Sequence, residues 1–113
     1  MSIIKPSEVV FANDKLEKSF DKLPENDEIK IYIRRAINQI KTNAYCGTQY
    51  KKNLIPAEYV KKYKVNNLWK YDLPDGWRLI YALFPQNKVE ILSVIIEWFN
   101  HKNYDRRFHY SFI

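Results

Sequence analysis

The chain has 113 residues, of which 46% are hydrophobic and 16% aromatic, so it can build one packed core but is too short for two domains. Its 19 basic and 13 acidic side chains give a net charge of +6, and its single cysteine excludes an intrachain disulfide. It shows no apolar run of membrane-spanning length and no secretory signal pattern. We therefore expect one cytoplasmic domain over residues 1–113, without contact to a membrane and without a metal or other cofactor.

The first part of the chain predicts one short strand and two helices. Residues 8–12 form an apolar run typical of a strand. Asp14 and Glu17 have the spacing of a capping box, and apolar residues follow at helical intervals, which predicts a helix over 14–23. Acidic residues at its start and isoleucines at helical spacing predict a second helix over 25–43. We expect these two helices to form an antiparallel hairpin on an apolar sheet.

The segment 44–67 is basic and without regular periodicity. Pro56 occupies a plausible first helical position, so one or two helical turns are expected after it. The remainder reads as a long loop, and such loops in small domains either carry function or are simply solvated. Its candidate RNA-binding residues are Lys51, Lys52, Lys61, Lys62 and Lys64.

The last third of the chain predicts three strands, over 68–73, 77–84 and 89–99. A Pro-Asp-Gly turn separates the first two, and a Pro-Gln-Asn-Lys turn separates the second from the third. Short turns make consecutive strands antiparallel. With the first strand added, the expected fold is α+β, a two-helix hairpin packed on one face of a four-stranded, mainly antiparallel sheet.

Charge and aromatic residues are concentrated in the second half. Residues 51–113 carry eleven basic and six acidic side chains and 13 of the 18 aromatic residues. Basic groups can neutralise phosphates while aromatic rings stack on bases, so this composition permits nucleic-acid binding. A lysine-rich protein whose aromatic residues form the core has the same composition.

Strand alternation predicts which polar side chains share a face. If Leu73 faces Trp77 across the turn, then Asp72 lies opposite Arg78 and Lys70 lies beside them on the face away from the helices. Such a group could form a charged platform for a phosphate. It could equally be an ordinary cross-strand ion pair on a solvated face.

The C-terminal segment is the second candidate site. It contains both histidines of the chain, at positions 101 and 109, together with several basic and tyrosine side chains. Imidazole exchanges protons near neutral pH, and a cation beside it can stabilise the charge that develops on a phosphate during cleavage. The alternative is a basic tail. The further candidate RNA-binding residues here are Arg106 and Arg107.

From residue 67 the chain reads Asn-Leu-Trp-Lys-Tyr-Asp-Leu-Pro-Asp-Gly-Trp-Arg-Leu-Ile-Tyr, followed by a turn and an apolar strand that ends in Asn-His-Lys. This order resembles the RelE/ParE toxin superfamily over residues 68–108. The resemblance implies two helices on a curved antiparallel sheet and, for RelE-like members, an endoribonuclease that cuts mRNA. It implies mRNA and a cognate antitoxin protein as partners, with the ribosome as a further candidate.

The resemblance also assigns roles to residues of this chain. Arg78 matches the arginine that contacts the scissile phosphate, and Lys70 matches the first lysine of the preceding strand. Asp72 stands where the family has a second lysine, which reverses the charge. The remaining candidate catalytic residues lie after the last strand: His101 and Lys102 near a basic pair, and Tyr104 or Phe108 near a tyrosine that can act as base. The Arg-Phe-His-Tyr end resembles YoeB-type members, which leaves His101 and His109 as alternatives.

Three functions follow from these residues, and one of them is a general RNA- or DNA-binding module that uses the basic segment 44–67. The other two are more specific. The first is a metal-independent endoribonuclease toxin, in which His101 or Tyr104 transfers protons while Arg78, Lys70 and Lys102 hold the phosphate. The second is a ParE-like or solitary binding protein without nuclease activity, which the acidic residue at position 72 favours.

Overall fold

The computed structural model describes residues 4–108 and shows an α+β fold within that range. Its α-helices and strands, in chain order, are β1 (Glu8–Phe11), α1 (Asp14–Lys22), α2 (Glu28–Thr42), β2 (Thr48–Gln49), α3 (Ala57–Tyr63), β3 (Trp69–Asp72), β4 (Arg78–Pro85), β5 (Ile91–Phe99) and α4 (His101–Arg107). Short 3₁₀ turns, η1 (Ala44–Cys46), η2 (Lys52–Leu54) and η3 (Pro74–Gly76), link some of these elements. The predicted helix after Pro56 is α3.

The sheet has five strands in the order β1-β5-β4-β3-β2, so the prediction of four strands was wrong. The additional strand β2 is two residues long and pairs with β3 at one edge. Two residues are too few to show a period-two alternation, which is why no sequence pattern indicated this strand. β3, β4 and β5 are antiparallel as expected, whereas β1 runs parallel to β5 at the other edge and makes the sheet mixed.

Both N-terminal helices begin at side-chain caps. The Asn13 side chain accepts a hydrogen bond from Leu16 N at 2.8 Å, so the cap lies one residue before the predicted Asp14. Asp27 accepts from Ile29 N at 2.8 Å and sets the start of α2 at Glu28 rather than at residue 25. An oxygen at the cap satisfies one of the free N–H groups of the first helical turn, which explains these starting points.

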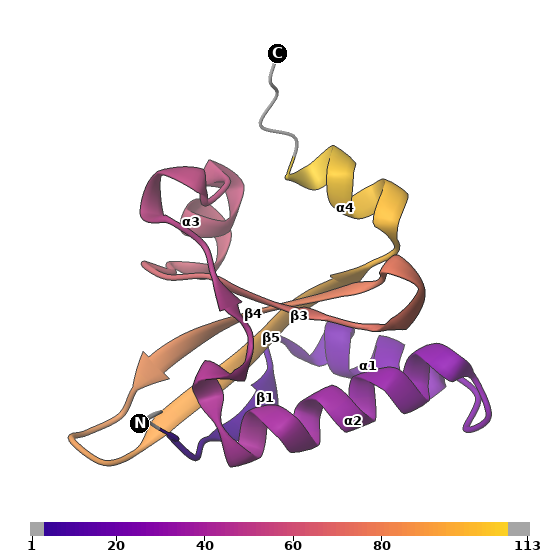
Figure 1. Ribbon diagram of the computed structural model, residues 1–113, viewed down its shortest axis with the longest axis horizontal. Coiled ribbons are helices and arrows are strands. Elements are labelled where there is room, and N and C mark those ends of the chain that lie inside the picture. Colours follow the sequence, from indigo (N-terminus) through magenta and orange to yellow (C-terminus); the bar gives the residue numbers. More distant parts are fainter. Residues whose placement is uncertain (1–3, 109–113) are drawn as a thin grey trace.

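The helices α1 and α2 lie on one face of the sheet (Figure 1). Their buried side chains include Phe20, Ile33 and Ile40, and these belong to one apolar cluster with residues of β3, β4 and β5. Alternate residues of β4, among them Leu79 and Tyr81, point into this cluster. Period-two alternation therefore sends their neighbours to the opposite face.

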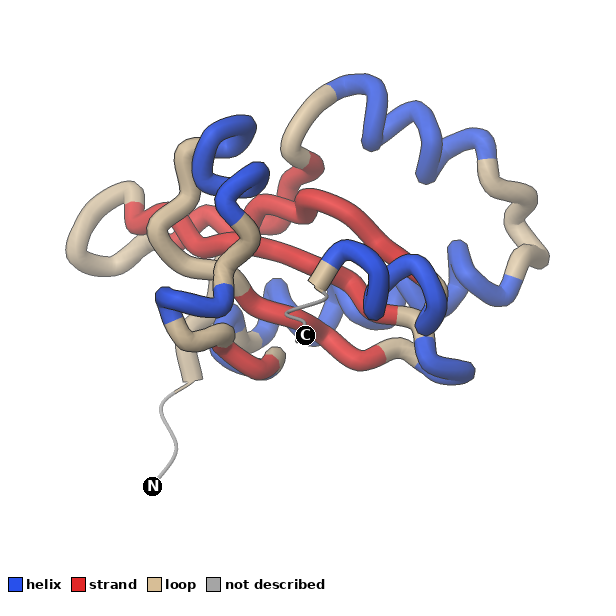
Figure 2. The backbone as a smooth tube through the Cα atoms, turned by 90° about the horizontal axis from the view of Figure 1, so that it is seen from above, coloured by secondary structure: helices blue, strands red, loops and turns tan. Residues whose placement is uncertain are grey.

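That opposite face is covered as well, which the sequence did not predict. Ile80 of β4 and Ile96 of β5 are fully buried there in a second cluster with Tyr59 of α3 and Phe108, the C-cap of α4. Viewed from above, the C-terminal helix crosses in front of the strands, and further helical turns lie behind them (Figure 2). The predicted polar group of Lys70, Asp72 and Arg78 therefore lies at the border of a second apolar core.

Tyr59 yields a prediction about stability. It is 1% exposed, and in the described part of the chain its hydroxyl has no hydrogen-bond partner. Burial, and then the nearby Glu97 carboxylate, raise the pKa of Tyr59 above its ordinary value of 10.0. The neutral phenol therefore contributes stability that is complete below about pH 10 and is lost as the pH rises further.

We expect Tyr59→Phe to leave the free energy of unfolding at pH 7 within about 1 kcal/mol of the wild type, because the lost hydroxyl has no hydrogen bond of regular geometry among the described residues. The variant should lose less stability than the wild type between pH 9 and pH 11. Urea unfolding at these pH values measures both quantities. A loss of more than about 3 kcal/mol at pH 7 would mean that the hydroxyl is paired in solution.

Candidate active site

The candidate site is built on the hairpin of β3 and β4. In the ladder Asp72 pairs with Arg78 and Lys70 pairs with Ile80, which confirms the predicted register. The turn closes through a hydrogen bond from Leu73 N to Trp77 O at 2.8 Å, and its residues Asp75 and Gly76 have φ values of 59° and 79°. Glycine and aspartate tolerate this left-handed conformation, so the local sequence specifies the turn and the turn specifies the register.

Arg78 and Lys70 converge on one carboxylate. Arg78 Nε lies 2.9 Å from Asp72 Oδ1, and Lys70 Nζ lies 3.3 Å from the same oxygen. The Arg78 contact is an ion pair in which the N–H does not have the geometry of a hydrogen bond. Asp72 is 58% exposed, whereas the side chains of Lys70 and Arg78 are 24% and 20% exposed. The carboxylate therefore lies on the solvent side of two partly covered cations.

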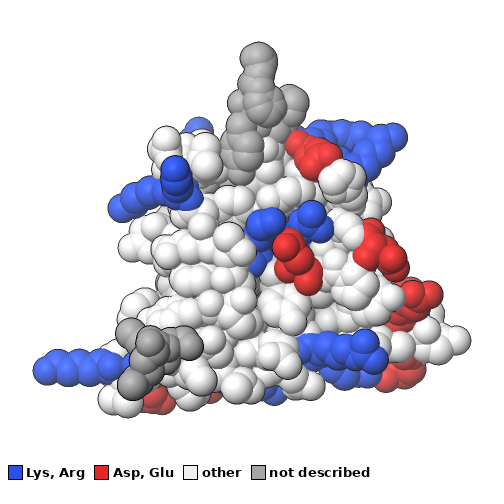
Figure 3. Space-filling view, viewed as in Figure 1, with Lys and Arg blue, Asp and Glu red and all other residues white. Residues whose placement is uncertain are grey.

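The helix α4 brings Tyr104 to this group. Arg78 Cζ lies 5.3 Å from the centre of the Tyr104 ring, a cation–π distance. The Tyr104 hydroxyl lies 2.5 Å from that of Tyr50, and its ring stacks on Phe108 at 4.8 Å. Asn100 caps the helix by accepting a hydrogen bond from Asn103 N at 2.8 Å. Basic and acidic side chains adjoin near the middle of the face seen in Figure 3, over the sheet.

His101 lies at the edge of this group. Its Nε2 is 3.2 Å from Asp105 Oδ2, one turn along α4, and its side chain is 66% exposed. A Cβ at Gly76 would come within 3.0 Å of the His101 Cβ, so this glycine lets the start of α4 approach the β3–β4 turn. The imidazole is paired with the Asp105 carboxylate, and the His101 Cβ lies close to Gly76 of the β3–β4 turn.

The other predicted catalytic groups are placed differently. Lys102 is exposed, and two helical positions before Tyr104 it occupies the far side of α4 from the arginine. His109, the alternative to His101, lies outside the described residues. The group that the structure brings together is therefore Lys70, Asp72, Arg78 and Tyr104, with His101 beside it.

The predicted RNA-binding residues fall into two sets. Arg106 is exposed, and so are the five lysines of the segment 44–67: Lys51, Lys52, Lys61, Lys62 and Lys64. Arg107 differs because its Nη1 lies 3.3 Å from both Glu58 and Glu97, and its guanidinium covers the rings of Tyr59 and Phe99. Its charge is already neutralised, so it ties α4 to α3 and β5.

Sequence reasoning missed Tyr50. The residue lies in the irregular segment, where no periodicity indicates which side chains turn inward. Its hydroxyl meets that of Tyr104 across 54 residues of chain. An aromatic residue within a basic segment was the one available signal, and it does not identify a partner.

In comparisons with known proteins, no family model, no curated protein and no solved structure matches the chain. In the described part of the chain, no helix is long and apolar enough to cross a membrane. Among residues 4–108, no three histidine, cysteine, aspartate or glutamate side chains gather as a metal site would require.

Proposed function

We propose that the protein is a RelE-like toxin, a metal-independent endoribonuclease that cleaves mRNA and is neutralised by an antitoxin protein. The observation that carries the proposal is the juxtaposition of Arg78 with Tyr104, since the guanidinium lies 5.3 Å from the ring centre. Lys70 lies on the same face, paired with the same carboxylate as Arg78. The two cations can bind a phosphodiester, and the phenol beside them can accept a proton from the ribose hydroxyl next to that phosphodiester.

The proposed cleavage uses the RNA as its own nucleophile. Tyr104 or His101 takes the proton of a ribose 2′-hydroxyl, and the oxygen attacks the adjacent phosphorus. The bond from phosphorus to the 5′-oxygen breaks, and this oxygen receives a proton from a second acid or from water. Arg78 and Lys70 stabilise the negative charge on the phosphate oxygens in the transition state. The products are a 2′,3′-cyclic phosphate and a 5′-hydroxyl, with no water consumed in this step.

The fold and the sequence motif support this proposal. Two helices lie on one face of the sheet, and the strand carrying Arg78 is central in it, as in the superfamily that residues 68–108 resemble. The net charge of +6 suits a polyanionic substrate and an acidic antitoxin segment.

Cleavage of end-labelled RNA by the purified protein tests the proposal. We expect fragments that end in 2′,3′-cyclic phosphate, either from free mRNA, where excess EDTA should leave the rate unchanged, or from mRNA on intact ribosomes, which are assayed with Mg²⁺ present. Expression in cells should arrest growth and shorten transcripts. Intact RNA under all these conditions, with folded protein, would refute the nuclease.

A ParE-like or solitary binding protein is the second candidate, and Asp72 favours it. Its Oδ1 pairs with both Lys70 and Arg78, so its single negative charge offsets part of their two positive charges. A pair of cations already bound to a carboxylate attracts RNA less strongly, and in the superfamily this position carries a lysine. A binding protein would arrest growth without shortening transcripts, or would have no effect on growth.

Asp72→Asn should therefore strengthen RNA binding by about fivefold, because it releases two cations from an exposed ion pair. The comparison variant is Asp75→Asn, which makes the same change in net charge in the adjacent turn, where asparagine tolerates the left-handed backbone. Fluorescence anisotropy with a labelled single-stranded RNA measures both affinities. Equal gains in the two variants would show that only net charge matters.

A further inference from the structure

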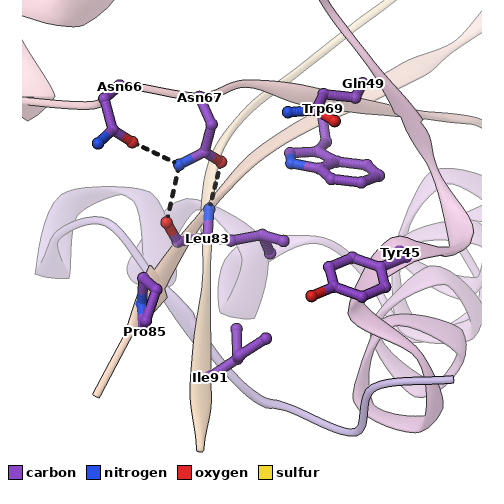
Figure 4. A pocket seen from close by; sticks show the side chains of 8 residues that line it. All are labelled: Tyr45, Gln49, Asn66, Asn67, Trp69, Leu83, Pro85 and Ile91. Carbon is purple, nitrogen blue, oxygen red and sulfur yellow. Dashed lines mark hydrogen bonds between the residues drawn. The ribbon is translucent and has the colours of Figure 1, made fainter. Parts of the chain in front are cut away.

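At the other end of the sheet from Arg78, the described structure holds a pocket of about 540 Å³ (Figure 4). Leu83 and Ile91, from the ends of β4 and β5, form its apolar wall together with the indole of Trp69. These three residues belong to the core face that α1 and α2 cover, so the pocket lies on the opposite face from Lys70. It is separate from the candidate active site.

The groups that line this pocket are polar and uncharged. Gln49 and Asn66 contribute amides, and the hydroxyl of Tyr45 lies on the Ile91 side of the pocket (Figure 4). None of the described side chains that line it is charged. The Asn67 amide donates to Leu83 O and accepts from Leu83 N, both at 2.9 Å, so this asparagine holds the wall in place.

An aromatic stack ends at the pocket. Trp69 lies between Tyr81 and Tyr45, with ring centres 6.1 and 5.7 Å away and interplanar angles of 26° and 20°. The outer ring, Tyr45, is 40% exposed. Trp69 is 9% exposed, and its buried Nε1 has no hydrogen-bond partner among the described residues.

We propose that this pocket binds an uncharged nucleobase. A flat heteroaromatic ring can lie in the pocket against the apolar wall and the exposed Tyr45 ring, and its polar edge can pair with the amides of Gln49 and Asn66, which line the same pocket beside Trp69. The uncharged wall disfavours a ligand whose recognised part carries charge, and the volume leaves room for an attached ribose. The base can belong to a free nucleoside or to an RNA strand. Either form of binding is independent of the proposed cleavage.

The test follows the indole N–H resonances in ¹H–¹⁵N spectra of the whole protein during titration with adenosine, uridine and a short single-stranded RNA. We expect a saturable shift for Trp69 and none for Trp77 or Trp98. Tyr45→Ala and Gln49→Ala should each weaken nucleoside binding about fivefold. The matched control is Gln39→Ala, an exposed glutamine on α2, which should bind as the wild type does.

The dissociation constants come from the Trp69 shift. If the RNA binds at least tenfold more tightly than the nucleosides, the bound base belongs to an RNA strand. If the affinities are equal, the ligand is a free nucleoside. The proposal is overturned if no nucleoside gives a saturable Trp69 shift at millimolar concentration, or if Tyr45→Ala and Gln49→Ala bind as the wild type does. It is also overturned if N-acetyltryptophanamide, a model of a peptide side chain, binds more tightly than every nucleoside. A protein without nuclease activity that still shows the Trp69 shift refutes the proposed function alone.

Discussion

Arg78→Met is expected to slow RNA cleavage by at least about 100-fold, the loss typical for removing one preorganised donor from a developing oxyanion. Methionine keeps most of the volume of the aliphatic stem beside Tyr104 and removes the charge. The experiment is a single-turnover measurement on a labelled RNA, with the protein in excess. Arg78→Met lacks the phosphate contact that stabilises the transition state, so its rate of cleavage should fall even when the protein saturates the RNA.

The control for this variant is Arg34→Met. Arg34 lies on α2, its side chain is 49% exposed, and it pairs with Glu25. Its loss should change cleavage less than twofold. Because Arg78 is 20% exposed and ion-paired, thermal unfolding of Arg78→Met must be measured alongside, and a cost of about 1 kcal/mol is expected. Unchanged cleavage in the folded variant would remove Arg78 from the mechanism.

The part of the fold that could be predicted from the sequence is the part in which local signals agree. Apolar stripes placed α1 and α2 within a few residues, and the Pro-Asp-Gly turn fixed the pairing of Asp72 with Arg78. Strand β1 was found, but its parallel pairing with β5 was not, because the neighbour of an edge strand depends on the whole sheet. Pairing between strands that are far apart in the sequence gives no signal in the local sequence pattern.

Helix α4 is a different kind of omission, because a signal was present. Asn100 is an N-cap residue, and Tyr104 and Phe108 follow at a spacing of four that places two aromatic rings on one face. The segment was interpreted as a candidate site or a basic tail, and not as a helix. Recognising this helix would have indicated that Tyr104 turns inward and that Lys102 does not.

The candidate site shows the same limit. Strand alternation placed Lys70, Asp72 and Arg78 together, since residues two apart on one strand share a face. The contact of Tyr104 with Arg78 depends on how α4 docks on the sheet, which Gly76 permits at its N-terminal end and Phe108 secures at its C-terminal end. How α4 docks depends on packing between segments that are distant in the sequence. Sequence patterns alone therefore suggested candidate site residues but not their arrangement in space.

A pair of tyrosine variants separates proton transfer from structure at this site. Tyr104→Phe and Tyr50→Phe remove the two ends of the same hydroxyl contact, whose oxygens are 2.5 Å apart. Both should cost about 1 kcal/mol of folding free energy, because each removes one partner of one hydrogen bond. Only Tyr104→Phe also removes the hydroxyl of the ring that Arg78 covers.

If Tyr104 is the proton-transfer group, Tyr104→Phe should slow cleavage by about 100-fold or more, within the range for general acid–base catalysis, while Tyr50→Phe should stay within about tenfold of the wild type. Cleavage rates and urea unfolding curves measured on the same preparations make the comparison. Equal losses in both variants would mean that the contact positions α4 and that Tyr104 carries no proton. In Tyr104→Phe the phenyl ring would still pack on Phe108 and hold α4 against the sheet, so the variant changes the hydroxyl alone. Full activity of this variant would therefore assign proton transfer to His101. The variant His101→Gln would then test that assignment.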